Sequence, residues 1–325
     1  MDYMSHLYGR SKKKIRELSC GTIYECGQVD DEKYIVTEYE LFQGVEVFYN
    51  DIHSAVIRNN MTLEPCETPR YEINHCREGR FECVLKDGTI TYMEAGDFAI
   101  NLMSNRSRES LFPISHYHGI TFCITPAEFD SDVKLLEKMY GMRYQQILES
   151  LCQDNKLFIK RATPEIQHIF HEMYRVPNNI ILPYLKVKFQ ELLLYLSTVD
   201  KNSTYSERKY FTKSNVDIVK NINHFIKQNF ANTQTYDSLS DKFHIKTTTM
   251  KNCYKSVYGE TINDTLRKTR LAAAAKLLAS TEFSITDIAL QIGYADHSKF
   301  SKAFKQMYNL TPSEYKKMSN RTQLV

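Results

Sequence analysis

Two histidines separated by one residue, His116 and His118, are the residues of this 325-residue sequence whose spacing best suits metal chemistry. In a strand, side chains two residues apart share a face, so both imidazoles could approach one ion. Metal-binding barrels with this His-x-His pattern also supply a glutamate soon afterwards and a later histidine. Here the next glutamate, Glu128, follows Pro126 outside a strand context. We therefore predict no metal and no cofactor, and expect the pair to contact an effector or support the fold.

A dense polar segment between Arg70 and Arg80 is a second candidate site. It contains Glu72, His75, Arg77, Glu78 and Arg80. Such side chains could line the mouth of a barrel, where His75 and Arg80 would bind an effector together with His116 and His118. A solvated hairpin face explains the same cluster equally well.

Polar side chains at helical spacing in the last hundred residues suit contact with DNA rather than catalysis. One set is Thr248, Lys251, Asn252 and Lys255, and the other is His297, Ser298, Lys299 and Lys302. Asparagine can form two hydrogen bonds with adenine, and lysine suits guanine or phosphate. Each set begins near the expected start of a helix, whose N-terminal amides favour phosphate.

The elements that must position these two sets are related by an internal repeat. Leu239, Ser240, Phe243 and Ile245 match Ile288, Ala289, Ile292 and Tyr294 at an offset of 49, and Met250, Tyr254 and Tyr258 match Phe300, Phe304 and Tyr308 at an offset of 50. Each copy predicts a helix, a short turn and a second helix. The buried faces of the second helices are expected to be Met250, Cys253, Tyr254 and Val257, and Phe300, Ala303, Phe304 and Met307.

Helix-capping residues surround the repeat. Ser284 with Asp287, and Thr261 with Asp264, have capping-box spacing, Asp296 is an expected N-cap, and Gly293 is suited to the sharp turn of the second copy. Between the copies, Ile262 to Leu278 predicts a helix of roughly 26–28 Å. This length approaches the ~34 Å that separates successive major-groove faces of DNA. The pattern therefore predicts two helix-turn-helix motifs joined by a helix.

Three stretches of this region resemble the signature of the AraC/XylS family of regulators. They are Arg270-Leu271-x(3)-Ala275-x-Leu277-Leu278, Ile285-Thr286-Asp287-Ile288-Ala289-x(3)-Gly293-Tyr294-x-Asp296-x-Ser298-x-Phe300, and Thr311-Pro312-x-x-Tyr315. Ser240 replaces the usual alanine of the first motif, and Asn309 stands where glycine is usual. The resemblance implies that the two polar sets above contact bases or backbone. It also implies an N-terminal cupin-like domain for effector binding and dimerisation.

The N-terminal half independently favours a small β-barrel followed by helices. From Tyr71 to Thr125, strand-like segments alternate with turn signals at Asp87-Gly88 and Ala95-Gly96. Further on, Thr163 and Pro164 predict a helix start. A helix from about Ile181 to Thr198 carries an apolar stripe that is either a dimer seam or packed on its own barrel: Leu185, Phe189, Leu192 and Leu196.

The predicted fold class is therefore α+β with two domains. The expected boundaries are 1–199 for a cupin-like effector-binding and dimerisation domain, 200–214 for a polar linker, and 215–325 for an all-α double helix-turn-helix domain. From Ser206 onward the chain carries 19 Lys and Arg against 10 Asp and Glu, a net charge of +9, whereas the preceding part carries −6. This asymmetry favours nucleic acid contact at the C-terminal end alone.

Other features limit where the protein acts. Eight cysteines form no Cys-x-x-Cys pair, which favours buried free thiols. No signal peptide is apparent, and no apolar run approaches the ~18 residues of a membrane span. We expect a cytoplasmic protein with no membrane partner.

Three functions remain open from the sequence. The first is a transcription regulator, expected to be an activator and a homodimer, that binds double-stranded promoter DNA, works with RNA polymerase and responds to an unknown small-molecule effector. The second is a regulator whose N-terminal domain binds another protein. The third is a cupin metalloenzyme with a DNA-binding tail, which the missing metal-motif residues disfavour, so we expect no enzyme activity.

Overall fold

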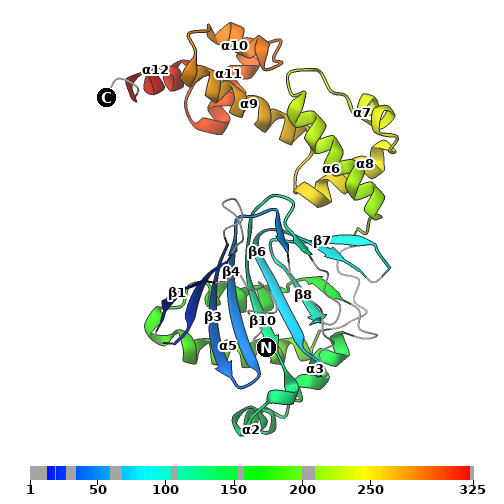
Figure 1. The fold of residues 1–325 in the computed structure, drawn as a ribbon, viewed down its shortest axis with the longest axis vertical. Helices are drawn as coiled ribbons and strands as arrows, with labels where there is room; N and C mark the ends of the chain where they lie inside the picture. The colour runs from blue at the N-terminus through cyan, green and yellow to red at the C-terminus, as the bar shows by residue number, and fades with distance from the viewer. Residues whose placement is uncertain are drawn as a thin grey trace. The chain divides into compact units, whose positions relative to one another are not determined.

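The computed structural model describes residues 13–18, 20–26, 34–58, 68–85, 87–103, 109–152, 157–199 and 209–322. The chain divides into two compact units, Met1–Tyr210 and Phe211–Val325 (Figure 1). Most of the predicted linker, residues 200–208, lies outside the described residues. The first helix of the second unit begins at Lys213, inside the predicted linker, and Phe211 is already buried.

The N-terminal unit is built on a curled antiparallel sheet (Figure 1). Its strands are β1 (Lys13–Glu17), β2 (Thr22–Cys26), β3 (Tyr34–Phe42), β4 (Val45–Ile52), β5 (Val56–Arg58), β6 (Tyr71–Val84), β7 (Ile90–Glu94), β8 (Asp97–Leu102), β9 (Glu109–Leu111), β10 (Tyr117–Ile124) and β11 (Phe158–Arg161). The main order is β1-β2-β3-β4-β10-β6-β8-β11, while β7 and β9 pair with the far end of β6 and β5 pairs with β9.

Turn residues set the course of the long strand β6. Gly79 has a φ of +92°, and a Cβ there would lie 2.0 Å from the carbonyl oxygen of His116, so only glycine allows β10 to begin this close. The Asp87-Gly88 turn joins β6 to β7 as predicted, with Gly88 at a φ of +80° and the Leu85 amide donating to the Thr89 carbonyl at 2.8 Å. The strands that precede Tyr71 were not predicted.

Helices cover one face of this sheet. They are α2 (Ser131–Tyr140), α3 (Tyr144–Leu151), α4 (Pro164–Met173) and α5 (Ile181–Ser197), with 3-10 turns η3 (Pro126–Glu128) and η5 (Asn178–Ile180). Thr163 caps α4 and Pro164 is its first residue, as predicted. Alternate side chains of the strands, such as Phe122, pack against the helices. The opposite side chains, such as Tyr117, form a second core with Ile57 of β5 and with Phe112, which follows β9.

The apolar stripe of α5 belongs to the first of these cores. Leu185, Phe189 and Leu192 are 0% exposed and Leu196 is 1% exposed within the single chain. The Phe189 ring centroid lies 5.5 Å from that of Phe122 on β10. The structure corrects the expectation of a dimer seam at these four positions, because side chains already buried on their own sheet are not available to a partner.

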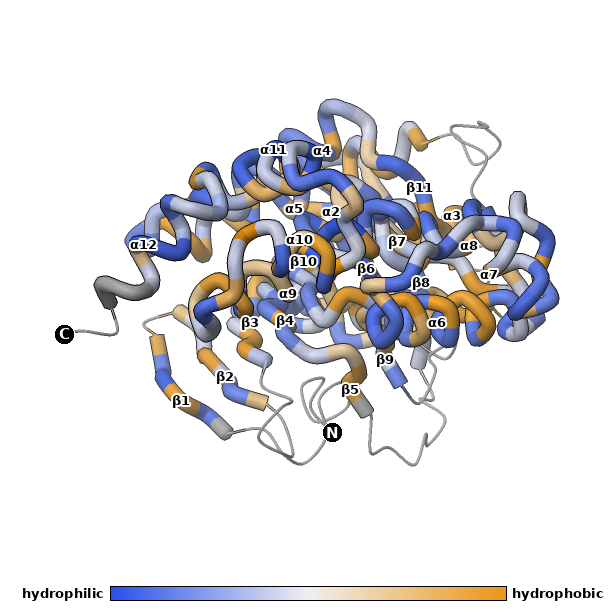
Figure 2. Tube along the Cα trace, turned by 90° about the horizontal axis from the view of Figure 1, so that it is seen from above, coloured by the Kyte–Doolittle hydropathy of each residue, from blue (hydrophilic) through white to orange (hydrophobic). Residues whose placement is uncertain are grey.

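The C-terminal unit is entirely helical. It contains α6 (Lys213–Gln228), α7 (Tyr236–Phe243), α8 (Thr247–Tyr258), α9 (Ile262–Ser280), α10 (Ile285–Gln291), α11 (His297–Tyr308) and α12 (Pro312–Thr322). Hydrophobic and hydrophilic segments alternate along α6 (Figure 2), whose buried side is Val216, Val219, Ile222 and Ile226. The predicted two-domain α+β fold class is confirmed, with a curled antiparallel sheet in the first unit and helix-turn-helix motifs in the second.

Two smaller expectations concern cysteines and membranes. The cysteines in the described part of the chain are free thiols, all buried except the half-buried Cys20, and Cys66 lies outside that part. Among the described residues, none of the helices combines the length and the apolar character that a membrane span requires.

Candidate nucleic-acid interface

Helix α8 presents the first predicted polar set. Its inner side, Met250, Cys253, Tyr254 and Val257, is 0% exposed, as predicted. On the other side Thr248, Lys251 and Lys255 are exposed and Asn252 is half-buried. The Lys251 ammonium lies 4.2 Å from the centroid of the Tyr236 ring, at the start of α7. The side chain of the N-cap residue, Lys246, accepts no hydrogen bond from the amides of the first turn of α8.

Helix α11 presents the second predicted polar set, and His297, Ser298, Lys299 and Lys302 are all exposed. Phe300 and Phe304 are fully buried on its inner side, and Ala303 is half-buried. Met307 is 42% exposed, so its predicted burial is wrong. Neither α8 nor α11 contains an acidic residue, which leaves both outer faces basic or neutral.

The N-terminus of α11 is closed by Asp296, as predicted. Its carboxylate accepts hydrogen bonds from the amides of Ser298 at 2.7 Å and Lys299 at 3.2 Å. The Lys299 amide and then the Ser298 amide hold the pKa of Asp296 below its ordinary value, because they stabilise the charged form. The expectation that amides at this helix start face phosphate is thus corrected for these two, which already donate to a carboxylate.

The long helix α9 connects the two motifs. Its 19 residues correspond to about 28 Å. The Thr261 side chain accepts from the Asp264 amide, and the Asp264 carboxylate accepts from the Thr261 amide, so the predicted capping box is confirmed. At α10 only half of the predicted box forms. Ser284 accepts from the Asp287 amide, but the Asp287 carboxylate accepts from the Ser284 hydroxyl at 2.6 Å instead of the Ser284 amide.

Arg270 on α9 joins the second motif to the loop between α6 and α7. Its guanidinium donates to the carbonyls of Phe230 at 2.7 Å and Asn232 at 3.0 Å, and lies 5.9 Å from the Tyr294 ring centroid. Gly293, at a φ of +85°, contacts the same loop. A Cβ at Gly293 would lie 2.3 Å from the backbone oxygen of Ala231, so glycine is required both by φ and by space.

The four residues predicted to bind an effector in the N-terminal unit do not all lie together. One of them, His75, is 1% exposed and stacks on Phe170 of α4 at 4.1 Å between ring centroids. Its nitrogens lie 3.3 Å from the Tyr174 hydroxyl and the Gln167 side-chain oxygen. Burial lowers the pKa of His75 to about 4, because desolvation disfavours the imidazolium. A neutral, packed histidine under a helix is a core residue.

Arg80 and the His116–His118 pair have different surroundings. Arg80 forms an ion pair at 2.6 Å with Glu94 on β7. His116 and His118 do lie side by side, with ring centroids 4.6 Å apart, and a third histidine, His53, lies next to both. Of the four predicted effector residues, the structure therefore brings together only this pair.

Sequence reasoning missed His53 and the joining role of Arg270. His53 follows β4, whose alternation of Val45, Val47 and Tyr49 was a usable strand signal. The partners of Arg270 are backbone carbonyls about 40 residues earlier in the chain, and carbonyls leave no trace in residue types.

Comparison with known proteins agrees with the C-terminal geometry. Residues 239–318 match a family model described as a helix-turn-helix domain. A stretch of 129 residues is 28% identical to the HTH-type transcriptional activator RhaS of Escherichia coli O1:K1 / APEC, over 40% of this chain and 44% of that protein. A stretch of 120 residues is 32% identical to Histidine kinase P4 of Formosa agariphila, over 34% of this chain and 9% of the kinase.

Among solved structures, the C-terminal domain of AraT, a response regulator from Geobacillus stearothermophilus, is 29% identical over 31% of this chain and 84% of that domain, with a TM-score of 0.30. The chain spans less than half the length of the curated relatives named above.

Two helix-turn-helix motifs on either side of a long helix define the C-terminal unit as an AraC-type DNA-binding unit. Apart from Met307, the buried sides of α8 and α11 are those that helical periodicity predicts, and the predicted polar sets are exposed except for the half-buried Asn252. Residues 239–318 therefore form a helix-turn-helix domain of the AraC type, which supports a DNA-binding regulator.

Proposed function

We propose that this protein is a sequence-specific transcription regulator that binds double-stranded promoter DNA through α8 and α11. The observation that carries this proposal is the shared construction of these helices. Each buries one side in the core of the C-terminal unit and exposes another side that has lysines and hydroxyl groups but no acidic residue. Helix α9, at about 28 Å, approaches the ~34 Å of one DNA turn, which suits two contacts with successive major grooves.

The two motifs contribute differently to DNA binding. The first turn of α8 lacks a side-chain cap, and the ammonium of Lys251 lies over Tyr236, so this helix is suited to phosphate contacts that place the protein on DNA. Two first-turn amides of α11, those of Ser298 and Lys299, already donate to Asp296. Its contacts in this proposal therefore come from the exposed side chains, foremost Lys302, which suit base edges.

The N-terminal unit supplies the regulation in this proposal. A small-molecule effector bound by this unit changes promoter binding, and the protein activates transcription as a homodimer together with RNA polymerase. The activator role is supported by the relative named a transcriptional activator. Control by a protein partner at the same unit is the alternative, and thermal-shift screening of the full chain against small metabolites distinguishes the two.

Selection of binding sites from random double-stranded DNA with the full-length protein tests DNA recognition. We expect a preferred sequence, and loss of its specific binding in Lys302→Ala and Asn252→Ala. The matched control is Lys138→Ala, which removes the same charge from an exposed position on α2. Wild-type affinity of both α8 and α11 variants, in folded protein, would show that these faces do not bind DNA.

A further inference from the structure

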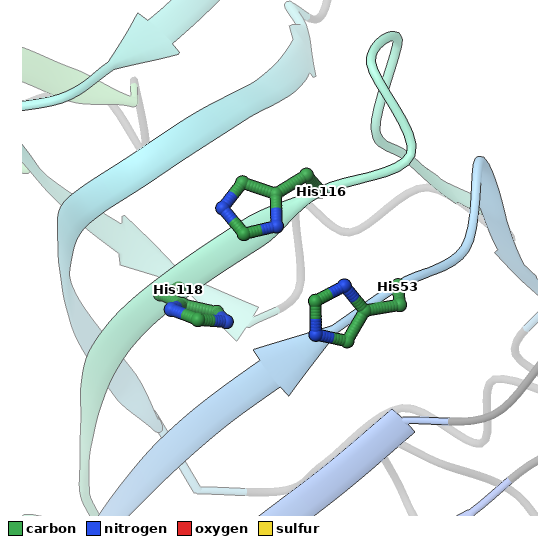
Figure 3. A group of neighbouring side chains, drawn as sticks. All are labelled: His53, His116 and His118. Carbon is green, nitrogen blue, oxygen red and sulfur yellow. The ribbon is translucent and has the colours of Figure 1, made fainter. Parts of the chain in front are cut away.

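Three histidines converge on one face of the N-terminal sheet. His53 directly follows β4, His116 directly precedes β10, and His118 lies within β10 (Figure 3). One ring nitrogen from each can be chosen so that all three lie within 4.8 Å of one another. The cluster follows from strand register. His118 pairs with Asp51 across β10 and β4, so His118 and His116, two residues before it, lie on the same face as Asp51 and His53.

Two carboxylates surround the histidines. Asp51 Oδ1 lies 2.9 Å from His53 Nε2 and 2.5 Å from His118 Nε2. From the other side, Glu78 of β6 places Oε2 3.4 Å from His116 Nε2 and 3.8 Å from His118 Nδ1. Three neighbouring strands thus bring three imidazoles and two carboxylates to one place.

The backbone around this cluster is fixed. Residues of β10 pair with β4 on one side and with β6 on the other, so the histidines and Glu78 come from paired strands. Gly79 follows Glu78 and allows the backbone of His116 to approach closely, as described above. This arrangement keeps Glu78 next to His116 and His118.

The cluster lies on the face of the sheet opposite Tyr117. Tyr117, between His116 and His118, is buried in the second core together with Ile57 and Phe112, so the two histidines point the other way. The side chains of His53, His116 and His118 are 59%, 35% and 29% exposed. An ion from solvent can therefore approach the partly exposed rings, although Nε2 of His118 is itself buried.

We propose that His53, His116 and His118 bind one divalent transition metal ion of the zinc class. Neutral imidazole is a preferred ligand of Zn²⁺, Cu²⁺ and Ni²⁺. Three histidines with an open fourth position form a known type of Zn²⁺ coordination. With metal–nitrogen distances near 2.0–2.1 Å, tetrahedral ligand nitrogens lie about 3.4 Å apart, so rotation of the imidazoles on their fixed strands closes the site.

The two carboxylates fit this proposal as partners of the ligands. Metal-bound histidines commonly hold a carboxylate on their second nitrogen, which orients the ring and raises its basicity. Here Asp51 Oδ1 and His118 Nε2 are buried and lie close together, but they form no hydrogen bond with each other. Buried polar atoms without a hydrogen bond lower the stability of the folded protein. A cation held by the three rings would rearrange this pair into a bound ligand and its carboxylate partner.

This site differs from the metal motif of His-x-His barrels. That motif has a glutamate after the histidine pair and a later histidine, whereas here the third histidine and both carboxylates precede His116 in the chain. The proposal does not depend on the proposed function, since it concerns metal binding by the N-terminal unit whether or not the chain regulates transcription.

Titration of the reduced, metal-free full-length protein with Zn²⁺ and Co²⁺ tests the proposal, using calorimetry and the visible absorption of bound Co²⁺. We expect one ion per chain, a higher melting temperature on binding, and no comparable binding of Mg²⁺, which prefers oxygen ligands. His53→Ala and His116→Ala should each weaken Zn²⁺ binding at least 100-fold, and Asp51→Asn by about 10–100-fold. The matched control is His168→Ala, an exposed histidine of α4 whose ion pair is with Glu172.

Several results would overturn the proposal. Equal Zn²⁺ affinity of the parent and the two histidine variants would do so, and so would the thiolate absorption of a Co²⁺–cysteine site. His53 is exposed and His116 is half-buried outside the two cores, so both variants are expected to fold, and circular dichroism checks this. If a variant is misfolded, failure of the parent protein to bind one Co²⁺ with histidine-type absorption overturns the proposal by itself.

Discussion

The two helix-turn-helix motifs share a plan but differ in what fills their cores and closes their helices. In the first, Tyr254 is fully buried and its hydroxyl lies 2.9 Å from both Asn223 Oδ1 and Thr265 Oγ1. In the second, the equivalent Phe304 has no hydroxyl and lies in an apolar cluster with Leu271 and Ile288, with the rings of Tyr308 at 4.6 Å and Tyr315 at 5.4 Å between centroids. The first core therefore contains a buried hydroxyl with hydrogen-bond partners, and the second is apolar at the equivalent position.

The helix ends differ as well. The αL residue of the first turn is His244, at a φ of 52°, whereas the second turn uses Gly293 and contacts the loop after α6. Helix α8 lacks the side-chain cap that Asp296 gives to α11. Sequence divergence between the copies therefore follows a division of tasks. The second motif is capped and packed as a rigid support for side chains, and the first keeps an open helix end.

The largest expected effect comes from removing the aromatic centre of the second motif. Phe304→Ala should destabilise it by about 3–5 kcal/mol, because a large buried ring is replaced by a cavity. Hydrogen exchange should show lost protection in α10 and α11 before α8. Equal loss in both motifs would show that they fold as one unit and would remove the basis of the comparison.

Arg270→Ala tests what joins the second motif to the first. This substitution removes two charge-assisted hydrogen bonds to the carbonyls of Phe230 and Asn232. We expect the free energy of unfolding to fall by about 2–3 kcal/mol and amide hydrogen exchange to become faster in the loop between α6 and α7. Affinity for a two-site DNA should fall more than affinity for a single half-site. The control is Arg267→Ala, an exposed position on the same helix. An equal fall for both DNAs would contradict the joining role.

Lys302→Ala and Lys251→Ala sharpen the difference in DNA contact. Loss of a base contact from α11 should reduce discrimination between the preferred and altered sequences by about 1–3 kcal/mol. Loss of a phosphate contact from α8 should weaken binding to all sequences alike. It should also reduce by about 1 the slope of the logarithm of the binding constant against the logarithm of the salt concentration. Binding measured at several salt concentrations separates the two outcomes, and identical behaviour of the variants would refute the division of tasks.

Tyr254→Phe tests the hydrogen-bonded core of the first motif. Removing the hydroxyl leaves Asn223 and Thr265 with one partner fewer. We expect the free energy of unfolding to fall by about 1–2 kcal/mol, with the effect confined to the region of α6, α8 and α9. The converse change, Phe304→Tyr, places a hydroxyl among aromatic rings and should also destabilise. Denaturation of both variants measures their stability against that of the parent protein. We expect both variants to be less stable, and parent-like stability of both would show that the two positions accept either residue.

The smallest effects concern the helix ends. Asp296→Ala should lower the melting temperature less than the core variants do, because it removes an exposed cap from the Ser298 and Lys299 amides. Lys246→Asp should raise stability by supplying α8 with a cap, yet weaken DNA binding by placing negative charge at an open helix end. Unchanged DNA affinity in Lys246→Asp would show that this end does not contact phosphate.

Much of the C-terminal unit was predictable because its determinants are local. The Thr261–Asp264 box, the N-cap Asp296 and the turn at Gly293 are encoded within a few residues, and each occurs as predicted. Helical periodicity also indicates which faces are buried, with Met307 as the exception near the exposed end of α11. The strands before Tyr71 were not predicted, although β1 to β4 pair with their neighbours along the chain. Their connection to the rest of the sheet is distant in the chain, because β4 pairs with β10 and β5 pairs with β9.

The sequence by itself determined the DNA-binding unit, since caps, turns and helix faces depend on neighbours along the chain. Only the tertiary structure decided that the α5 stripe is core, because a stripe of leucines suits a partner helix and a covering sheet equally. It also decided that His53 joins His116 and His118, because strand register brings together residues more than 60 positions apart. The sequence showed the metal-binding potential of the single histidines, but the pairing of strands across the sheet decided that they lie next to each other.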